Sequence, residues 1–260
     1  MKIAFITLSR EGAALYPRLK ESFGELDFYL HSAITSDAEA KPFDRIVELM
    51  HEIFAQYQGL IYAAPCGVVV RALAACVSSK LSDPAVVVTD VGARWAISLL
   101  SGHEGGANQL AQRVANLLDA EAIVTTTTEA VKDLIVGIGC RRGATREQIM
   151  DAIAQGLKAA HLPLERVRLL ASASIKSDEQ GLLDAAEELE IPVRFISLDA
   201  IRACPQEHGS SAFVEKSIGV PAVSEPVALL AGKRTSLLLR KSIFNSVTVA
   251  IAQENCMSLA

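Results

Sequence analysis

Aromatic residues, glycine and proline are all sparse in this chain of 260 residues. Aromatics make up 5% of the sequence although half of it is hydrophobic, so most apolar side chains are aliphatic. Such a composition favours helices packed on sheets over an aromatic-rich β-sandwich. The 16 glycines and nine prolines are too few for a collagen-like or low-complexity chain, and the apolar content excludes intrinsic disorder.

Long hydrophobic runs are missing as well. Charged residues such as Arg71, Asp90 and Arg94 interrupt the apolar stretches before they reach the length of about 20 residues that a membrane span requires. The apolar run at residues 3–6 is too short for a signal peptide, and no cleavage site follows it. We therefore expect a cytoplasmic protein that does not contact membranes.

The sequence has neither an excess of basic residues nor closely spaced pairs of cysteines. The net charge of −5 argues against a surface that binds nucleic acid. The five cysteines contain no C-x-x-C pair, and no H-E-x-x-H or paired-carboxylate spacing occurs, so neither a disulfide framework nor a protein-bound metal is indicated. An anionic ligand would have to be recognised by individual arginines and backbone amides.

Strand-like and helix-like segments alternate along the first half of the chain. The expected strands are residues 2–7, 27–30, 59–63, 85–89, 95–100 and 122–128. Helices are expected near residues 43–57, 68–77 and 109–118. This alternation, with short connections, is typical of a mostly parallel sheet that helices cover on both faces.

The alternation restarts with a strand at residues 134–138. Thr145 and Gln148 have the spacing of a capping box, which predicts a helix over residues 146–160. Later strands are expected at residues 167–171 and 193–196, and a final hairpin from residues 237–240 and 247–251. We therefore predict an α/β protein with two domains, residues 1–131 and 132–260, each a mostly parallel sheet flanked by helices.

The strongest local signal for a site is the glycine-rich loop at residues 101–108. Glycines allow a ligand to approach the backbone, and the helix that follows points N–H groups at the loop, which suits a carboxylate, a phosphate or a developing oxyanion. His103 is suited to proton transfer near neutral pH, with Glu104 orienting it or acting as the base. A tight turn that exposes the histidine explains the same residues about equally well.

A second candidate is the turn at residues 137–143, which also leads into a helix. Arg141 and Arg142 could bind carboxylate or phosphate groups there, although a solvated arginine pair is nearly as plausible. Cys140 is more simply a small buried thiol. Taken alone, Arg71 and Arg94 are more simply surface residues.

Two groups of motifs together resemble one known family. Residues 91–92, 100–108 and 122–127 resemble the N-terminal domain of the CbiG family, the cobalt-precorrin-5A hydrolases of anaerobic cobalamin biosynthesis. Residues 137–143 and 219–228 resemble its C-terminal domain, and this half is also similar to the CobE-type proteins of the aerobic pathway. Many family members carry a segment between the two domains. Here Thr128 and Leu134 are almost adjacent, which indicates a shorter member.

This resemblance implies an enzyme that opens the ring-A δ-lactone of cobalt-precorrin-5A and releases acetaldehyde, giving cobalt-precorrin-5B. His103 would accept a proton from the attacking water, with Glu104 as its orienting partner or the alternate base. The backbone amides of Gly105, Gly106 and Ala107 would stabilise the oxyanion. Carbon–carbon cleavage would follow by a retro-aldol-like collapse into the conjugated macrocycle. No organic cofactor is then required, and cobalt arrives as part of the substrate.

The substrate carries acetate and propionate arms, for which arginine is a suitable partner. On this basis the residues assigned to substrate binding are Arg71, Arg94, Ser101, Gly102, Gly105, Gly106, Asn108, Cys140, Arg141, Arg142, Ser224 and Glu225. Other enzymes of the cobalamin pathway are conceivable partners, and the sequence leaves the oligomeric state open. One alternative is a non-catalytic carrier that binds labile corrin intermediates. A weaker one is an unrelated α/β regulator that binds anions.

Overall fold

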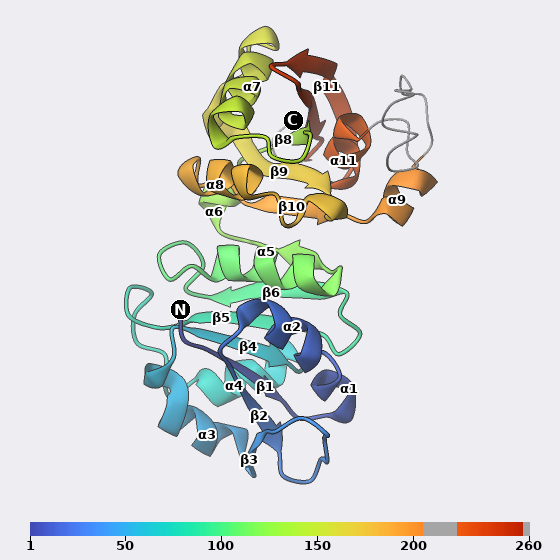
Figure 1. The fold of residues 1–260 in the computed structure, drawn as a ribbon. Helices are drawn as coiled ribbons and strands as arrows, with labels where there is room; N and C mark the ends of the chain where they lie inside the picture. The colour runs from blue at the N-terminus through green and yellow to red at the C-terminus, as the bar shows by residue number, and fades with distance from the viewer. Residues whose placement is uncertain (205–222, 257–260) are drawn as a thin grey trace. The chain divides into compact units, whose positions relative to one another are not determined.

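The computed structural model describes residues 1–204 and 223–256. The chain divides into two compact units, Met1–Thr126 and Thr127–Ala260. Each unit contains one sheet with helices on both faces, which confirms the predicted α/β fold in two parts (Figure 1). The domain boundary near Lys132 stays a prediction.

A seven-stranded sheet forms the centre of the first unit, in the order β3-β2-β1-β4-β5-β6-β7. Its strands are β1 (Ile3–Thr7), β2 (Leu26–His31), β3 (Lys41–Phe43), β4 (Gly59–Ala63), β5 (Ala85–Thr89), β6 (Trp95–Leu100) and β7 (Glu121–Ile123). Strands β1 to β5 are parallel to one another. The chain then reverses, because β6 is antiparallel to β5, and β7 is parallel to β6.

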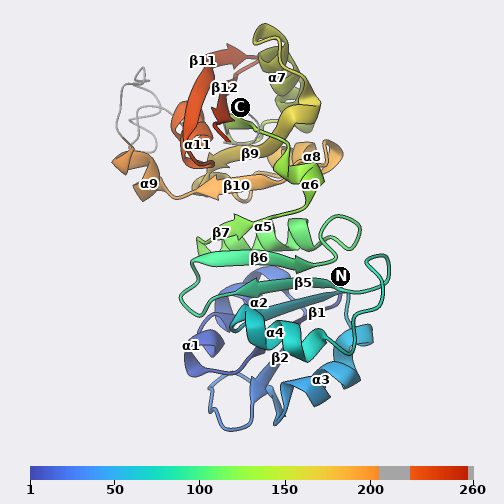
Figure 2. The ribbon, with the colours of Figure 1, turned by 180° about the vertical axis from the view of Figure 1, so that it is seen from behind.

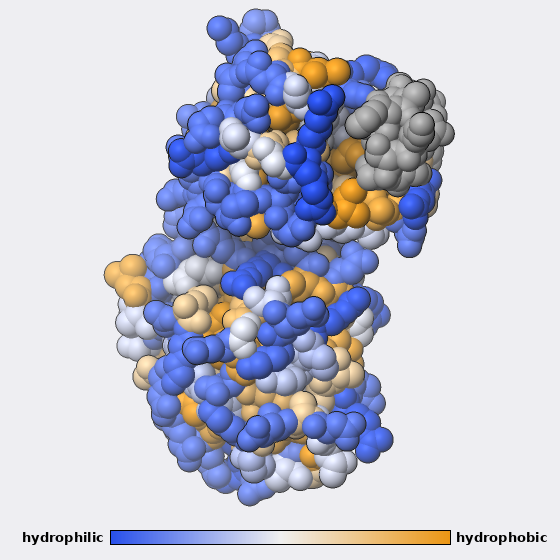
Figure 3. Space-filling view, in the orientation of Figure 1, coloured by the Kyte–Doolittle hydropathy of each residue, from blue (hydrophilic) through white to orange (hydrophobic). Residues whose placement is uncertain are grey.

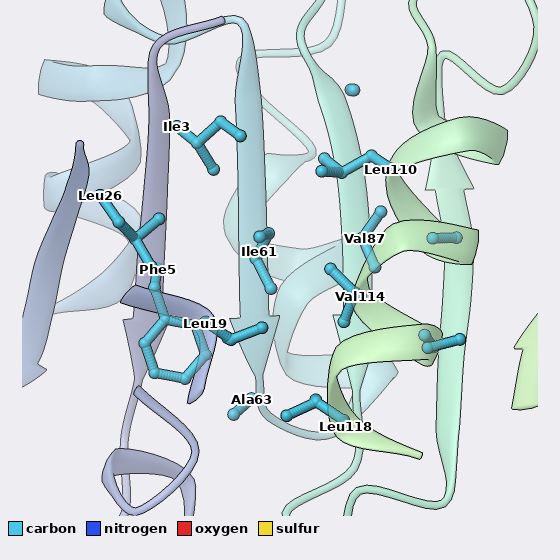
Figure 4. Close-up of a cluster of buried hydrophobic side chains, with 14 of the residues drawn as sticks. Ile3, Phe5, Leu19, Leu26, Ile61, Ala63, Val87, Leu110, Val114 and Leu118 are labelled. Carbon is cyan, nitrogen blue, oxygen red and sulfur yellow. The ribbon is translucent and has the colours of Figure 1, made fainter. Parts of the chain in front are cut away.

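Helices cover both faces of this sheet. They are α1 (Arg10–Ala13), α2 (Tyr16–Phe23), α3 (Ile46–Ile53), α4 (Cys66–Leu73) and α5 (Ala107–Leu118). Helices α2 and α5 pack on one face and α3 and α4 on the other, as the front and back views show (Figures 1 and 2). Figure 4 shows Phe5, Ile61 and Val87 of three neighbouring strands beside Val114 and Leu118 of α5.

Successive residues of a strand point to opposite faces, so every residue of β1 and β4 is buried in one of two cores. The α2/α5 core receives Ile3 and Phe5, while the α3/α4 core receives Ala4 and Ile6. Central parallel strands therefore consist of continuous apolar runs, which is why the sequence marks them clearly.

The second unit has a five-stranded sheet in the order β10-β9-β8-β12-β11. Its strands are β8 (Leu134–Gly139), β9 (Val167–Ala173), β10 (Val193–Ile196), β11 (Thr235–Phe244) and β12 (Val247–Glu254). Strands β8, β9 and β10 are parallel, while β12 pairs antiparallel with both β8 and β11. The predicted C-terminal hairpin is confirmed as β11 and β12.

Helices also cover both faces of the second sheet. They are α6 (Thr127–Ala130), α7 (Arg146–Ala159), α8 (Gln180–Glu188), α9 (Leu198–Ala203) and α11 (Ser224–Leu230). Helices α7 and α8 bury their apolar residues against one face, and α9 and α11 against the other (Figure 1). The capping box of α7 is confirmed, since Thr145 and Gln148 each bond to the backbone of the other.

Two segments differ from the predictions. The strand expected at residues 122–128 ends at Ile123, and Thr127 begins the short helix α6. β7 is the edge strand of its sheet, so only β6 is available to hold it in an extended conformation. In the helix expected at residues 43–57, Phe43 instead ends β3 and α3 begins at Ile46.

In the view of Figure 3, hydrophilic residues dominate the visible face of each unit, and smaller hydrophobic areas are scattered among them. None of the helices in residues 1–204 and 223–256 is long and apolar enough to cross a membrane.

Candidate functional site

The glycine-rich loop lies at the carboxyl end of β6, beside the end of β7. Because β6 is antiparallel to β5, with Leu100 opposite Val86, this is also the amino end of β5. The loop continues into α5, a helix of 12 residues. The loop therefore lies at the amino ends of the parallel strands β1 to β5, on the side opposite their carboxyl ends, where α/β sheets commonly bind ligands.

Backbone hydrogen bonds close the loop. Gly106 is the N-terminal capping residue of α5 and has φ +84°, which a residue with a side chain rarely adopts. The amide of Ala107 donates to the carbonyl of Ser101 at 3.1 Å, and the amide of Asn108 donates to that of Gly102 at 2.9 Å. Our expectation that the Ala107 amide binds an oxyanion is therefore wrong, because that donor is already used within the loop.

Close packing explains two of the loop's glycines. A Cβ atom on Gly102 would lie 2.7 Å from Thr126 Cγ2, and one on Gly105 would lie 2.4 Å from Ser101 Cβ. The side chain of Asn108, at the start of α5, is bonded to β6 and to the segment after β7. Its Oδ1 accepts from Ser98 Oγ of β6 at 2.8 Å, and its Nδ2 donates to Thr126 Oγ1 at 2.9 Å. Asn108 thus fixes the conformation of the loop.

His103 and Glu104 are both exposed at the tip of this loop. Glu104 Oε1 accepts a hydrogen bond from Lys80 Nζ at 2.5 Å, and this bond holds the pKa of Glu104 below its usual value. The carboxylate is therefore paired with Lys80, and the His103 imidazole makes no hydrogen bond to the described part of the chain. This leaves the imidazole accessible to a water molecule or a ligand.

Arg71 and Arg94 lie near the carboxyl ends of β4 and β5, whereas His103 lies near the amino end of β5. Asp90 follows β5 and accepts hydrogen bonds from the Arg94 amide, the Trp95 amide and Arg94 Nε. Arg71 donates to the Gly67 carbonyl in the first turn of α4, at the carboxyl end of β4. The five residues of β5 span about 17 Å, so these two arginines and the His103 loop belong to two separate sites at opposite ends of the strand.

In the second unit the turn after β8 is bound to the segment after β9. Arg142 Nη1 lies 3.0 and 2.9 Å from the two carboxylate oxygens of Asp178. Glu179 accepts from the Gly143 amide at 2.7 Å and from Lys176 Nζ at 3.0 Å. The Lys176 and Glu179 side chains are only 12% and 6% exposed, so this ion pair is buried and holds the turn after β8 in place.

Cys140 lies in the same turn and is partly buried. Burial raises the pKa of its thiol; Lys176 opposes this shift and Glu179 adds to it. Cys140 is therefore protonated near neutral pH, as expected for the simple buried thiol. Arg141 is exposed beside it.

Ser224 and Glu225 begin α11 and are buried, at 1% and 4% exposure. Glu225 Oε1 accepts from the Lys241 amide of β11 at 2.7 Å. A Cβ atom on Gly137 would lie 2.0 Å from the Ser224 carbonyl oxygen, so α11 and β8 approach as closely as only glycine permits. Residues 219–222 of the motif that includes Ser224 lie outside the described residues.

Sequence reasoning missed Lys80, Lys176 and Glu179. The Lys80–Glu104 pair joins loops 24 positions apart, and no local pattern marks it. Lys176 and Glu179 have an i, i+3 spacing directly after β9, which is a weak signal. In residues 1–204 and 223–256, no group of three or more His, Cys, Asp or Glu side chains is arranged to hold a metal ion.

Comparison with known families finds two matches that follow the division into units. A model described as "Cobalamin synthesis G N-terminal" matches residues 48–129. A model described as "Cobalamin synthesis G C-terminus" matches residues 134–252. Together the two models cover more than half of the chain.

Individual relatives have related names. A Salmonella typhimurium protein named cobalt-precorrin-5A hydrolase is 26% identical, over 73% of this chain and 80% of its own length. A Priestia megaterium protein of the same name is 23% identical, over 96% and 94%. The crystal structure of CobE, a protein from the cobalamin (vitamin B12) biosynthetic pathway, is 30% identical over 47% of this chain and 90% of its own, with a TM-score of 0.45.

Proposed function

The chain belongs to the cobalamin synthesis G (CbiG) family, and from this membership we propose that it is a cobalt-precorrin-5A hydrolase. The reaction opens the ring-A δ-lactone of the substrate and releases acetaldehyde, giving cobalt-precorrin-5B in cobalamin biosynthesis. The observation that carries this proposal is that both family models match, in the order N-terminal then C-terminal.

His103 is the base that we propose for the first step. Its imidazole is exposed and free of hydrogen bonds to the described residues, so a water molecule can bind to it. The imidazole takes a proton as the water oxygen bonds to the lactone carbonyl carbon. The same proton then passes to the ring oxygen as the carbon–oxygen bond breaks.

Glu104 acts less directly in this proposal. Its carboxylate is bound to Lys80 and makes no hydrogen bond to the His103 imidazole, so it is a weaker candidate for the base. The exposed Lys80 ammonium places a positive charge beside the reaction loop, where it can attract an acetate or propionate arm of the substrate.

Arg94 and Arg142 are paired with Asp90 and Asp178. We propose that arginines among Arg71, Arg94, Arg141 and Arg142 contact the acetate and propionate arms of the substrate. We propose no organic cofactor, and the cobalt ion is part of the substrate.

The test is acetaldehyde release from cobalt-precorrin-5A by the purified protein. We expect turnover by the wild type and a loss of at least about 100-fold in His103→Ala, because removing a general base costs about that much. His51→Ala is the matched control, since His51 is an exposed histidine on α3 of the same unit.

Two results would contradict the proposal in different ways. Unchanged turnover in His103→Ala removes the imidazole from the mechanism while leaving the activity in place. Stoichiometric binding of the pigment without any acetaldehyde identifies the alternative, a carrier of corrin intermediates.

A further inference from the structure

Ser101 stands out because its buried hydroxyl lacks a partner. The residue directly follows β6 and has φ +58°, a left-handed conformation that is uncommon for serine. It is 6% exposed, and within the described residues its Oγ atom has no hydrogen-bond partner. Buried hydroxyls are nearly always bonded, so an unsatisfied one calls for a functional explanation.

This hydroxyl lies inside the glycine-rich loop. A Cβ atom on Gly105 would lie 3.3 Å from Ser101 Oγ, and the Ser101 carbonyl already accepts from the Ala107 amide at the start of α5. The amide of Gly105 makes no hydrogen bond to the described parts of the chain, and that of Gly106 makes only the weak contact to the His103 carbonyl that closes the turn at residues 104–105. A buried hydroxyl and two amides thus sit at the N-terminal end of a 12-residue helix, where the helix dipole favours an anion.

We propose that Ser101 is a catalytic residue whose hydroxyl, with the Gly105 and Gly106 amides, binds an anionic oxygen. This inference rests on the proposed function, in which that oxygen forms as water attacks the lactone carbonyl. The carbonyl π electrons move onto the oxygen, which the donors bind, and they return when the ring carbon–oxygen bond breaks. The loop itself covers the Ser101 hydroxyl, so binding of the oxygen requires the loop tip at residues 103–105 to move, while Asn108 keeps the start of α5 bound to Ser98 and Thr126.

The stability of one variant separates this role from a structural one. An unsatisfied buried hydroxyl destabilises the folded state, so Ser101→Ala keeps or raises the melting temperature. Ser98→Ala is the matched control, because Ser98 lies three residues earlier, on β6, and its Oγ donates a hydrogen bond to Asn108 Oδ1. Losing that bond lowers the melting temperature. If Ser101 donates a hydrogen bond in the transition state, Ser101→Ala therefore loses activity without losing stability.

The first experiment measures acetaldehyde release and melting temperature for the wild type and both variants. We expect kcat of Ser101→Ala to fall about 100-fold with little change in KM, since a single oxyanion donor is worth about that much. Ser98→Ala is expected to lose more stability and less kcat. A kcat of Ser101→Ala within twofold of the wild type would overturn the proposal, and so would a melting temperature that falls together with kcat.

A second experiment uses inorganic phosphate as a probe of the same donors. We expect phosphate to raise the melting temperature of the wild type and to have a smaller effect on Ser101→Ala. If the wild type releases no acetaldehyde but this difference persists, the proposed function fails and the anion site stands. An equal shift in both proteins, or no shift in the wild type, overturns the anion site.

Discussion

Asp133, at the amino end of β8, is a carboxylate that accepts three hydrogen bonds from two side chains. Its oxygens accept from Arg166 Nε at 2.9 Å, Arg166 Nη2 at 2.6 Å and Gln253 Nε2 at 2.7 Å. The hydrogen bond from Arg166 outweighs burial and holds the pKa of Asp133 below its ordinary value of 3.8. A carboxylate of this kind stabilises the fold in its ionised form only.

The pH dependence of stability follows from that direction. Because the folded pKa is lowered, the contribution is fully present above pH 3.8 and is lost as the pH falls through the folded value. We expect Asp133→Asn to lower the free energy of unfolding by about 2 kcal/mol at pH 7, with the difference shrinking below about pH 4. Urea titrations at several pH values measure this. The control is Asp199→Asn, whose side chain is 93% exposed. A difference independent of pH would contradict the assignment.

At the scale of the element, the loop before α5 depends on two glycines for different reasons. A Cβ atom on Gly105 meets Ser101 Cβ at 2.4 Å, whereas one on Gly106 meets nothing within 4 Å but stands at φ +84°. We expect Gly106→Ala to destabilise by about 1 kcal/mol through backbone strain, and Gly105→Ala by about 2–3 kcal/mol through overpacking. Urea unfolding of both variants measures the order. Equal losses would show that the loop yields at Gly105.

Elements specified by neighbouring residues were predicted well, while long-range arrangements were not. The Thr145–Gln148 capping box and the hairpin turn at Asn245–Ser246 each span only a few positions, and both α7 and the β11–β12 hairpin form as expected. The reversal of β6 is decided by pairing with β5, and no local pattern reveals it. For the same reason, the sequence correctly indicated the glycine-rich loop, but Arg71 and Arg94 were assigned to the same substrate site although they lie at the opposite ends of the strands.

At the scale of the whole molecule, the two units have separate cores. Each hydrophobic cluster draws its buried residues from one unit only. We therefore expect residues 1–126 and 127–260 to fold as independent fragments, each with a cooperative urea transition. Circular dichroism and urea unfolding of the purified fragments measure this. A fragment without a cooperative transition would show that it requires the other for stability.

The reversal of direction between β5 and β6 also matters for protein engineering. It gives the first unit two rims, one with the Asp90–Arg94 turn and one with His103, separated by the length of β5. Insertions at the Asp90 rim leave the backbone of the other rim in place. A fluorescent label or an affinity tag placed beside Gly92 would therefore report on the Asp90–Arg94 turn while the His103 loop keeps its backbone conformation.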